Sequence, residues 1–233
     1  MFFGWPMFYD PTYFLVVLSG ILAIGASLYC NSVLRKYSRI QVRSGVTGRQ
    51  AAEQVLQAAG IYDVSIQQMG GVGISFYRYD KSVHLSNELY HQSSITAVAT
   101  AAHECGHAIQ HHTGYTINRL IQAINPVMQL GSGLALPIFF LGLLFSFEFL
   151  QTAGIVLFLV VVVFQLLTLP SEFNASNRAV AMLQSTGILT TQEEIKGAKK
   201  VLFAAGLTYV AALAEALLQL LRLIILSGGR DRD

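Results

Sequence analysis

Four long apolar stretches alternate with more polar segments along this chain of 233 residues. They cover residues 13–29, 127–147, 152–169 and 201–226. A helix needs about 20 apolar residues to cross a hydrocarbon core of roughly 30 Å, and each stretch reaches or approaches that length. Glu215 and Arg222 interrupt the last stretch, so an amphipathic helix on the membrane surface is the alternative there. We therefore expect about four transmembrane helices.

The polar region after the first stretch has helical and strand patterns. Residues 47–59 predict an amphipathic helix, with Thr47 as N-cap and Gly60 as its stop. Residues 94–111 predict a second helix, rich in alanine. Three short strands are predicted between the two helices, at residues 64–69, 74–79 and 83–85.

Composition agrees with a membrane protein. Hydrophobic residues make up 53% of the chain and charged residues only 12%, whereas soluble domains carry about 25% charged residues. The net charge of +2, with no basic run interleaved with aromatics, gives no reason to expect a nucleic-acid partner. Cys30 and Cys105 are too few and too distant for a disulfide framework.

Basic residues predict the orientation, because Lys and Arg favour the cytoplasmic side of a membrane. No Lys or Arg precedes the first apolar stretch, and five follow it closely: Arg35, Lys36, Arg39, Arg43 and Arg49. We therefore expect the N-terminus outside and the polar region in the cytoplasm of a multi-pass cell-membrane protein. If the fourth stretch spans, Arg230 and Arg232 lie outside, against this rule.

The chemistry concentrates in the motif His103-Glu104-Cys105-Gly106-His107. Positions i and i+4 share one face of a helix, so His103 and His107 can present two imidazoles to one Zn²⁺. Glu104 then lies beside the metal as general base for a zinc-bound water, whose pKa the metal lowers towards ~7. The motif indicates a zinc metallopeptidase, and two helix histidines in local hydrogen bonds are the alternative.

A catalytic zinc needs a third protein ligand. The extended motif with a further glycine and histidine fails, because Gln110 and Thr113 occupy those positions. His111 shares the helix face but lies roughly 12 Å along the axis from His103, and His112 is a weaker candidate.

Glu172, just after the third apolar stretch, is the favoured third ligand. Two spans separate it from His107, so both return to one side of the membrane. Pro170 and the following Ser-Glu pair predict that a new helix starts there. The alternative is an interfacial carboxylate near a helix N-terminus.

Four segments resemble the YugP-type neutral zinc metallopeptidases of bacterial membranes: VTGRQAAEQVL, LSNELYHQSSITAVATAAHECGHAIQHHTGY, SEFNASNRA and LTYVAALAEALLQLL. The arrangement is also similar to the HtpX and CAAX prenyl protease peptidases. The resemblance implies a gluzincin site with one Zn²⁺ per chain, held by His103, His107 and Glu172, with Glu104 as base. Those relatives often have an Asp four residues after the ligand glutamate, where this chain has Ser176, so the group supporting a zinc histidine stays open.

The predicted fold class is a mainly α membrane protein with a small α+β, zincin-like cytoplasmic subdomain. We expect the chain to comprise five parts: an anchor at 1–30, the zincin-like region at 31–125, a transmembrane hairpin at 126–170, a cytoplasmic helix at 171–200, and a last transmembrane helix at 201–226.

The predicted activity is endopeptidase cleavage of peptides or membrane proteins at the cytoplasmic face of the lipid bilayer. Candidate donors to the oxyanion are Arg178, Tyr209 and His112, and the strand at 82–86 is a candidate for pairing with substrate. Alternatives are a site-2-type intramembrane protease, whose motif would lie within a span, and an inactive metal-binding scaffold or transporter.

Overall fold

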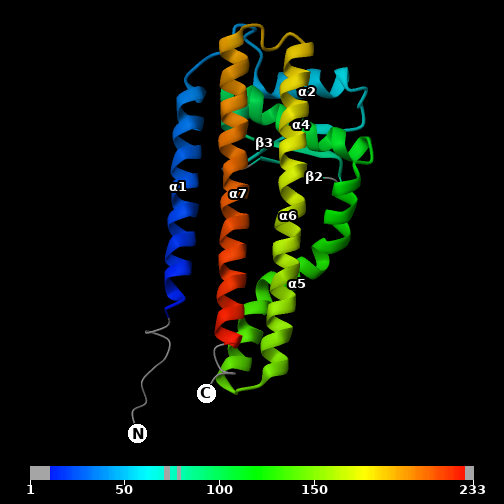
Figure 1. Ribbon diagram of the computed structural model, residues 1–233. Coiled ribbons are helices and arrows are strands. Elements are labelled where there is room, and N and C mark those ends of the chain that lie inside the picture. The colour runs from blue at the N-terminus through cyan, green and yellow to red at the C-terminus, as the bar shows by residue number, and fades with distance from the viewer. Residues whose placement is uncertain (1–10, 71–73, 78–79, 229–233) are drawn as a thin grey trace. The chain divides into compact units, whose positions relative to one another are not determined.

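The computed structural model describes residues 11–70, 74–77 and 80–228, and it is mostly helical (Figure 1). The described residues form seven helices: α1 (Tyr13–Ser38), α2 (Gly48–Ala58), α3 (Asn87–His91), α4 (Ile95–His112), α5 (Thr116–Leu144), α6 (Glu148–Ser185) and α7 (Gln192–Gly228). They also form three strands: β1 (Ser65–Met69), β2 (Ile74–Tyr77) and β3 (Ser82–Ser86).

The chain divides into two compact units. Unit 1 comprises Met1–Ala26, Ile121–Thr168 and Tyr209–Asp233, and unit 2 comprises Ser27–Leu120 and Leu169–Thr208. Four of the helices, α1, α5, α6 and α7, contribute residues to both units. The same four are long and apolar enough to cross a membrane, as the sequence predicts. Only 17–33% of the residues in their most apolar windows are buried, which suits side chains that face lipid.

Unit 1 has its own apolar core, which includes Phe139, Phe158 and Leu223. Small residues let its helices approach closely: a Cβ on Gly154 of α6 would lie 2.8 Å from the Ala135 carbonyl oxygen of α5. The guanidinium of Arg222 lies 5.8 Å from the centre of the Tyr13 ring. An aromatic face thus accepts this cation within the apolar part of α7.

Helix α6 continues without a break through Pro170, so the prediction that a new helix begins at Ser171 is wrong. Proline removes one backbone hydrogen bond and crowds the preceding turn, but a long membrane-type helix retains its other bonds and tolerates it. α5 likewise contains Pro126 and Pro137. Because α6 has 38 residues and a span needs about 20, its polar second half extends beyond the apolar stretch and belongs to unit 2.

Unit 2 contains the predicted mixture of helices and strands. α2 begins with a capping box, in which the Thr47 hydroxyl accepts from the Gln50 backbone and the Gln50 side chain accepts from the Thr47 backbone. Gly60 follows the helix with a φ of +72°, a left-handed conformation that glycine adopts without strain. These two features confirm the predicted start and stop of this helix.

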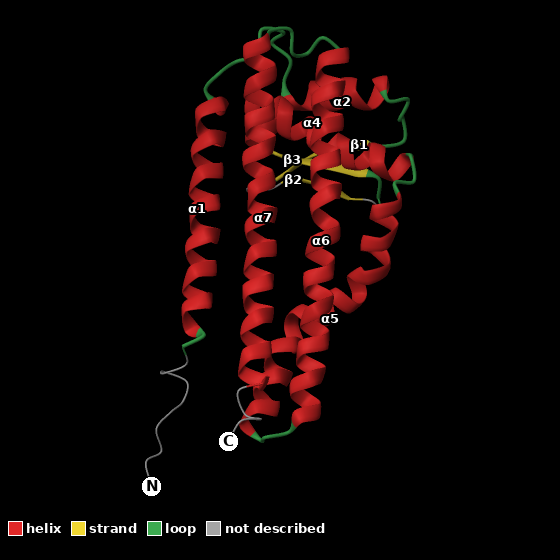
Figure 2. Ribbon diagram, in the orientation of Figure 1, coloured by secondary structure: helices red, strands yellow, loops and turns green. Residues whose placement is uncertain are grey.

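The sheet has the order β1–β3–β2, with β1 parallel and β2 antiparallel to β3 (Figure 2). The predicted strand 74–79 is described only as far as Tyr77, since residues 78–79 lie outside the described ranges. β3 is central and buried, and both of its edges are already paired. The expectation that β3 pairs with substrate is therefore wrong, and β2 is an edge strand of this sheet.

Helix α4 crosses the second half of α6 at small residues of unit 2. A Cβ built on Gly106 would lie 2.5 Å from the Ala175 carbonyl oxygen and 3.1 Å from the Ala175 Cα. Real Cβ atoms do not approach backbone so closely, so only glycine permits this crossing. Gly106 and Ala175 lie about one turn after His103 and Glu172 on their respective helices, so the crossing brings these side chains together.

Candidate metal centre

The structure brings together His103 and His107 of α4 with Glu172 of α6. One ligand atom from each residue lies within 4.8 Å of the other two. His103 Nε2 is 3.2 Å from Glu172 Oε2, and His107 Nε2 is 3.5 Å from Glu172 Oε1. The imidazole rings are nearly perpendicular, with centroids 4.8 Å apart. Both Nε2 atoms therefore face one carboxylate.

The electrostatics of these groups follow from their burial and proximity. Their side chains are only 12–20% exposed. Burial disfavours the charged form of Glu172, but hydrogen bonds with both histidines outweigh it and hold the pKa of this carboxyl at about 2. Burial by itself would lower the pKa of His107, but the adjacent Glu172 carboxylate raises it above its usual value. A negative charge is thus stable between the imidazoles and attracts cations.

Glu104 lies on the same helix and is buried, with 6% of its surface exposed. Burial raises the pKa of this carboxyl, although the two histidines partly oppose the shift. The backbone of Phe76 in β2 lies near the Glu104 carboxylate and also opposes this shift. Glu104 therefore lies between the histidine helix and the edge strand of the sheet.

Each histidine has a further hydrogen-bond partner, on the ring nitrogen away from Glu172. Ser176 Oγ is 3.1 Å from His103 Nδ1, so a hydroxyl four residues after Glu172 supports this ring. His107 Nδ1 lies 3.1 Å from Oε1 of Gln110, which is fully buried. Sequence reasoning missed Gln110, although its i+3 spacing from His107 places both on one helix face.

The other candidate residues have different surroundings. His111 and His112 line a cavity of about 220 Å³ at the end of α4, where the ring of His111 lies 6.1 Å from that of Phe76. Neither belongs to the cluster of three found among the described residues. Arg178 donates from Nε to Asn174 Oδ1 and lies over the Tyr115 ring. Tyr209 belongs to unit 1.

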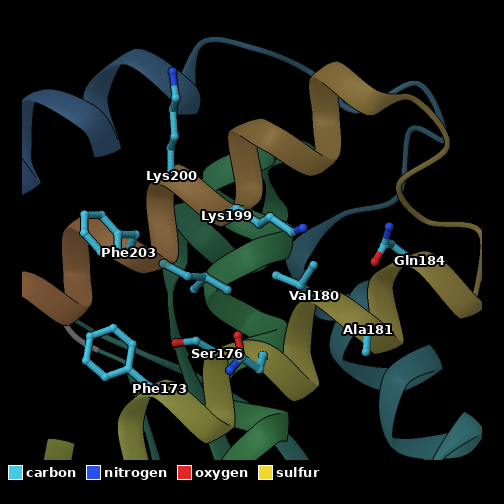
Figure 3. A pocket seen from close by; sticks show the side chains of 10 residues that line it. Phe173, Ser176, Val180, Ala181, Gln184, Lys199, Lys200 and Phe203 are labelled. Atoms are coloured by element: carbon cyan, nitrogen blue, oxygen red, sulfur yellow. The ribbon is translucent and has the colours of Figure 1, made fainter.

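A larger cavity of about 620 Å³ lies between α6 and α7 in unit 2 (Figure 3). Its walls are mostly apolar and include Phe173, Val180, Leu202 and Phe203, and two lysines line it as well, Lys199 and Lys200. Ser176 also lines this cavity and contacts His103 at Nδ1, whereas Glu172 lies at Nε2. The cavity therefore adjoins the side of the imidazole away from the carboxylate.

The donor set fits Zn²⁺ by its chemistry. Two imidazole nitrogens and one carboxylate oxygen are characteristic of a three-ligand zinc site that keeps a position for water. Cys105 within the motif does not take part, because it is fully buried and its thiol donates towards the Ala52 carbonyl oxygen. His103, His107 and Glu172 can thus hold one divalent cation.

A helical chain with four candidate spans and a His/His/Glu cluster defines a membrane protein with a candidate zinc centre. Comparison with known families agrees: residues 12–228 match the family described as "Putative neutral zinc metallopeptidase", and the chain belongs to this family. It is similar to the "Putative membrane protease YugP" of Bacillus subtilis (strain 168). The two are 40% identical over 222 residues, which cover 94% of this chain and 98% of that protein. No solved structure matches the chain.

Proposed function

We propose that this chain is an integral-membrane zinc endopeptidase that cuts peptide bonds at the cytoplasmic face of the cell membrane. The observation that carries the proposal is the convergence of His103, His107 and Glu172 within 4.8 Å, beside the buried Glu104. Family membership supports a zinc peptidase, and four apolar helices support a membrane location. Proposed substrates are peptides or segments of membrane proteins.

In this proposal the two Nε2 atoms and the Glu172 carboxylate hold one Zn²⁺ per chain. When bound, the ion supplies Lewis-acid polarisation of the peptide carbonyl and lowers the pKa of the attacking water. The three side chains fix the position of the ion because they come from two helices in contact. The negative charge of Glu172 also neutralises one of the two positive charges of the ion.

Glu104 is proposed to act as general base. Its carboxylate removes a proton from the attacking water, and the protonated form returns that proton to the leaving amine. Burial raises the pKa of Glu104, which makes its carboxylate a stronger base. Among the described residues, Glu172 is the one carboxylate in the His/His/Glu cluster, and its pKa is held at about 2.

The edge of β2 is the proposed binding surface for the substrate backbone. β2 pairs only with β3 in the described sheet. Phe76 of this strand lies near the Glu104 carboxylate. An extended peptide that pairs with this edge would place its carbonyl groups near Glu104.

The charge distribution supports a cytoplasmic site. All but three of the 15 Lys and Arg residues belong to unit 2, which also holds the His/His/Glu cluster. A site-2-type intramembrane protease is less well supported, because α4, which carries both histidines, is not among the four candidate spans.

The test is the substitution Glu104→Gln in the full chain, purified in detergent, with hydrolysis of fluorescein-labelled casein and zinc content both measured. Loss of the base should lower the rate by about 10²–10⁴-fold while zinc stays bound. Glu53→Gln is the matched control, since Glu53 is an exposed glutamate on α2 of the same unit. A Glu104→Gln protein that cleaves at the wild-type rate would remove the base assignment, and a wild type that binds zinc without cleaving would favour an inactive scaffold.

A further inference from the structure

Gln110 has no exposed surface, and both polar ends of its amide are fully engaged. Its Nε2 donates to the Ser171 carbonyl oxygen at 2.8 Å and to Asn174 Oδ1 at 3.1 Å. Its Oε1 accepts from Asn118 Nδ2 at 3.1 Å and lies 3.1 Å from His107 Nδ1. A buried amide with this many partners has a fixed orientation.

The orientation of the Gln110 amide follows from neighbouring groups that can act only as hydrogen-bond donors or only as acceptors. A guanidinium can only donate, so Asn174 Oδ1, bonded to Arg178 Nε at 2.8 Å, is an acceptor. Gln110 must then donate to this oxygen from Nε2, as it also does to the Ser171 backbone carbonyl, which can only accept. Oε1 therefore faces His107, and His107 Nδ1 must carry a proton to bond with it.

This proton on Nδ1 leaves the lone pair of neutral His107 on Nε2. That is the atom which faces the Glu172 carboxylate, at 3.5 Å: it donates a hydrogen bond to Glu172 when it is protonated and offers its lone pair to a cation when the ring is neutral. A metal-binding imidazole usually has its tautomer set by the hydrogen bond at its other nitrogen. Here Arg178 orients the Asn174 amide, and Asn174 in turn orients the Gln110 amide that sets the tautomer.

The same amide joins three helices of unit 2. Gln110 lies on α4 with the histidines, Asn118 on α5, and Ser171 and Asn174 on α6 on either side of Glu172. The Ser171 hydroxyl also donates to Asn118 Oδ1 at 2.6 Å. The network therefore fixes the position of Glu172 along α6 relative to the imidazoles of α4.

We infer that Gln110 is a positioning residue of the metal centre, which locks His107 in the Nδ1–H tautomer and holds the Glu172 segment against the histidine helix. The inference rests on the proposed zinc site and adds Asn174 and Arg178 as the groups that orient Gln110. His103 differs, because its partner Ser176 has a hydroxyl that can either donate or accept and so does not dictate a tautomer.

The experiment measures zinc affinity by competition with a chelating dye, using the full chain in detergent. Gln110→Met keeps the length of the side chain but removes both ends of the amide. Asn174→Leu removes the acceptor that orients Gln110, whereas Asn174→Asp keeps an acceptor oxygen in that place. Gln54→Met, on the exposed face of α2, is the control. Nitrogen-15 NMR of histidine-labelled protein reports the tautomers.

We expect zinc affinity to fall about 10–100-fold in Gln110→Met and in Asn174→Leu, the range for groups that support a metal ligand. Asn174→Asp should lose less than Asn174→Leu, and Gln54→Met should match wild type. The His107 signal should change from a single Nδ1–H form to a mixture in Gln110→Met. A merely structural role would not produce this change of tautomer.

The inference is overturned if folded Gln110→Met, judged by circular dichroism, keeps both wild-type zinc affinity and a single His107 tautomer. If Gln110→Met does not fold, the zinc affinities of Asn174→Leu and Asn174→Asp are compared instead, and equal affinities would overturn the inference. If His103→Ala and Glu172→Ala lose zinc but Gln110→Met retains it, the zinc-site assignment holds and only the role inferred for Gln110 is wrong. A wild type that binds no zinc would remove both.

Discussion

Replacing Gly106 by alanine tests the helix crossing that builds the site. The added Cβ would lie 2.5 Å from the Ala175 carbonyl oxygen, whereas non-bonded atoms are comfortable near 3.5 Å, so α4 and α6 must separate by about 1 Å. His103 and Glu172 lie one turn away on the two helices. Since zinc–ligand distances tolerate only about 0.2 Å, this separation should weaken zinc binding by at least tenfold.

Stability should also fall. Overpacking a well-packed core costs about 1–3 kcal/mol, which outweighs the roughly 1 kcal/mol that alanine gains over glycine in a helix. The assay is zinc competition together with thermal unfolding in detergent. Gly133→Ala on α5 is the matched control, because a Cβ there meets no atom within 4 Å, and we expect unchanged or slightly higher stability.

A second substitution sharpens this test. The clash involves the backbone oxygen of Ala175, not its methyl group. Adding Ala175→Gly to Gly106→Ala should therefore fail to restore zinc affinity. The reasoning is refuted if Gly106→Ala alone binds zinc and unfolds as the wild type does, or if Ala175→Gly rescues it completely.

Two further predictions concern unit 2. Glu194 precedes the apolar part of α7, and its carboxylate accepts from the backbone amides of Arg43, Thr190 and Thr191, which hold its pKa at about 2 although burial opposes this. Because the folded pKa is below the ordinary value of 4.5, this stabilisation is complete above pH 4.5 and is lost as pH falls towards 2. Glu194→Gln should thus unfold about 1–3 kcal/mol more easily near neutral pH, and a gap that does not narrow in acid would contradict the assignment. For orientation, Cys30 and Cys105 are buried, so a cysteine introduced by Gln54→Cys should react with a membrane-impermeant maleimide in inside-out vesicles but not in intact cells, and the reverse result would place unit 2 outside.

Much of this architecture could be predicted from local patterns. The apolar stretches predict four spans because a bilayer demands about 20 apolar residues from any helix that crosses it. The spacing of His103 and His107 predicts a shared helix face, and Thr47 predicts a cap, because both depend on neighbours within four residues. Glu172 required one further argument, that two spans return the chain to the side where it started.

The remaining features depend on contacts between distant segments. Nothing near Gln110 in the sequence shows that its amide meets Ser171 and Asn174, which lie more than 60 residues further along the chain. Pro170 predicts a helix start by its local preference, but the long helix on both sides overrides it. The central position of β3 is decided by pairing on both of its edges, which a single strand pattern does not encode.

The central claim is that two imidazoles of α4 and one carboxylate of α6 hold a zinc ion together. Metal analysis of the purified full chain beside His103→Ala, Glu172→Ala and the control Glu53→Gln tests this claim most directly. We predict about one zinc per chain in the wild type and the control, and little in the two ligand variants, because each leaves only two of three protein ligands. Equal zinc content in all four proteins would contradict the assignment of both ligands.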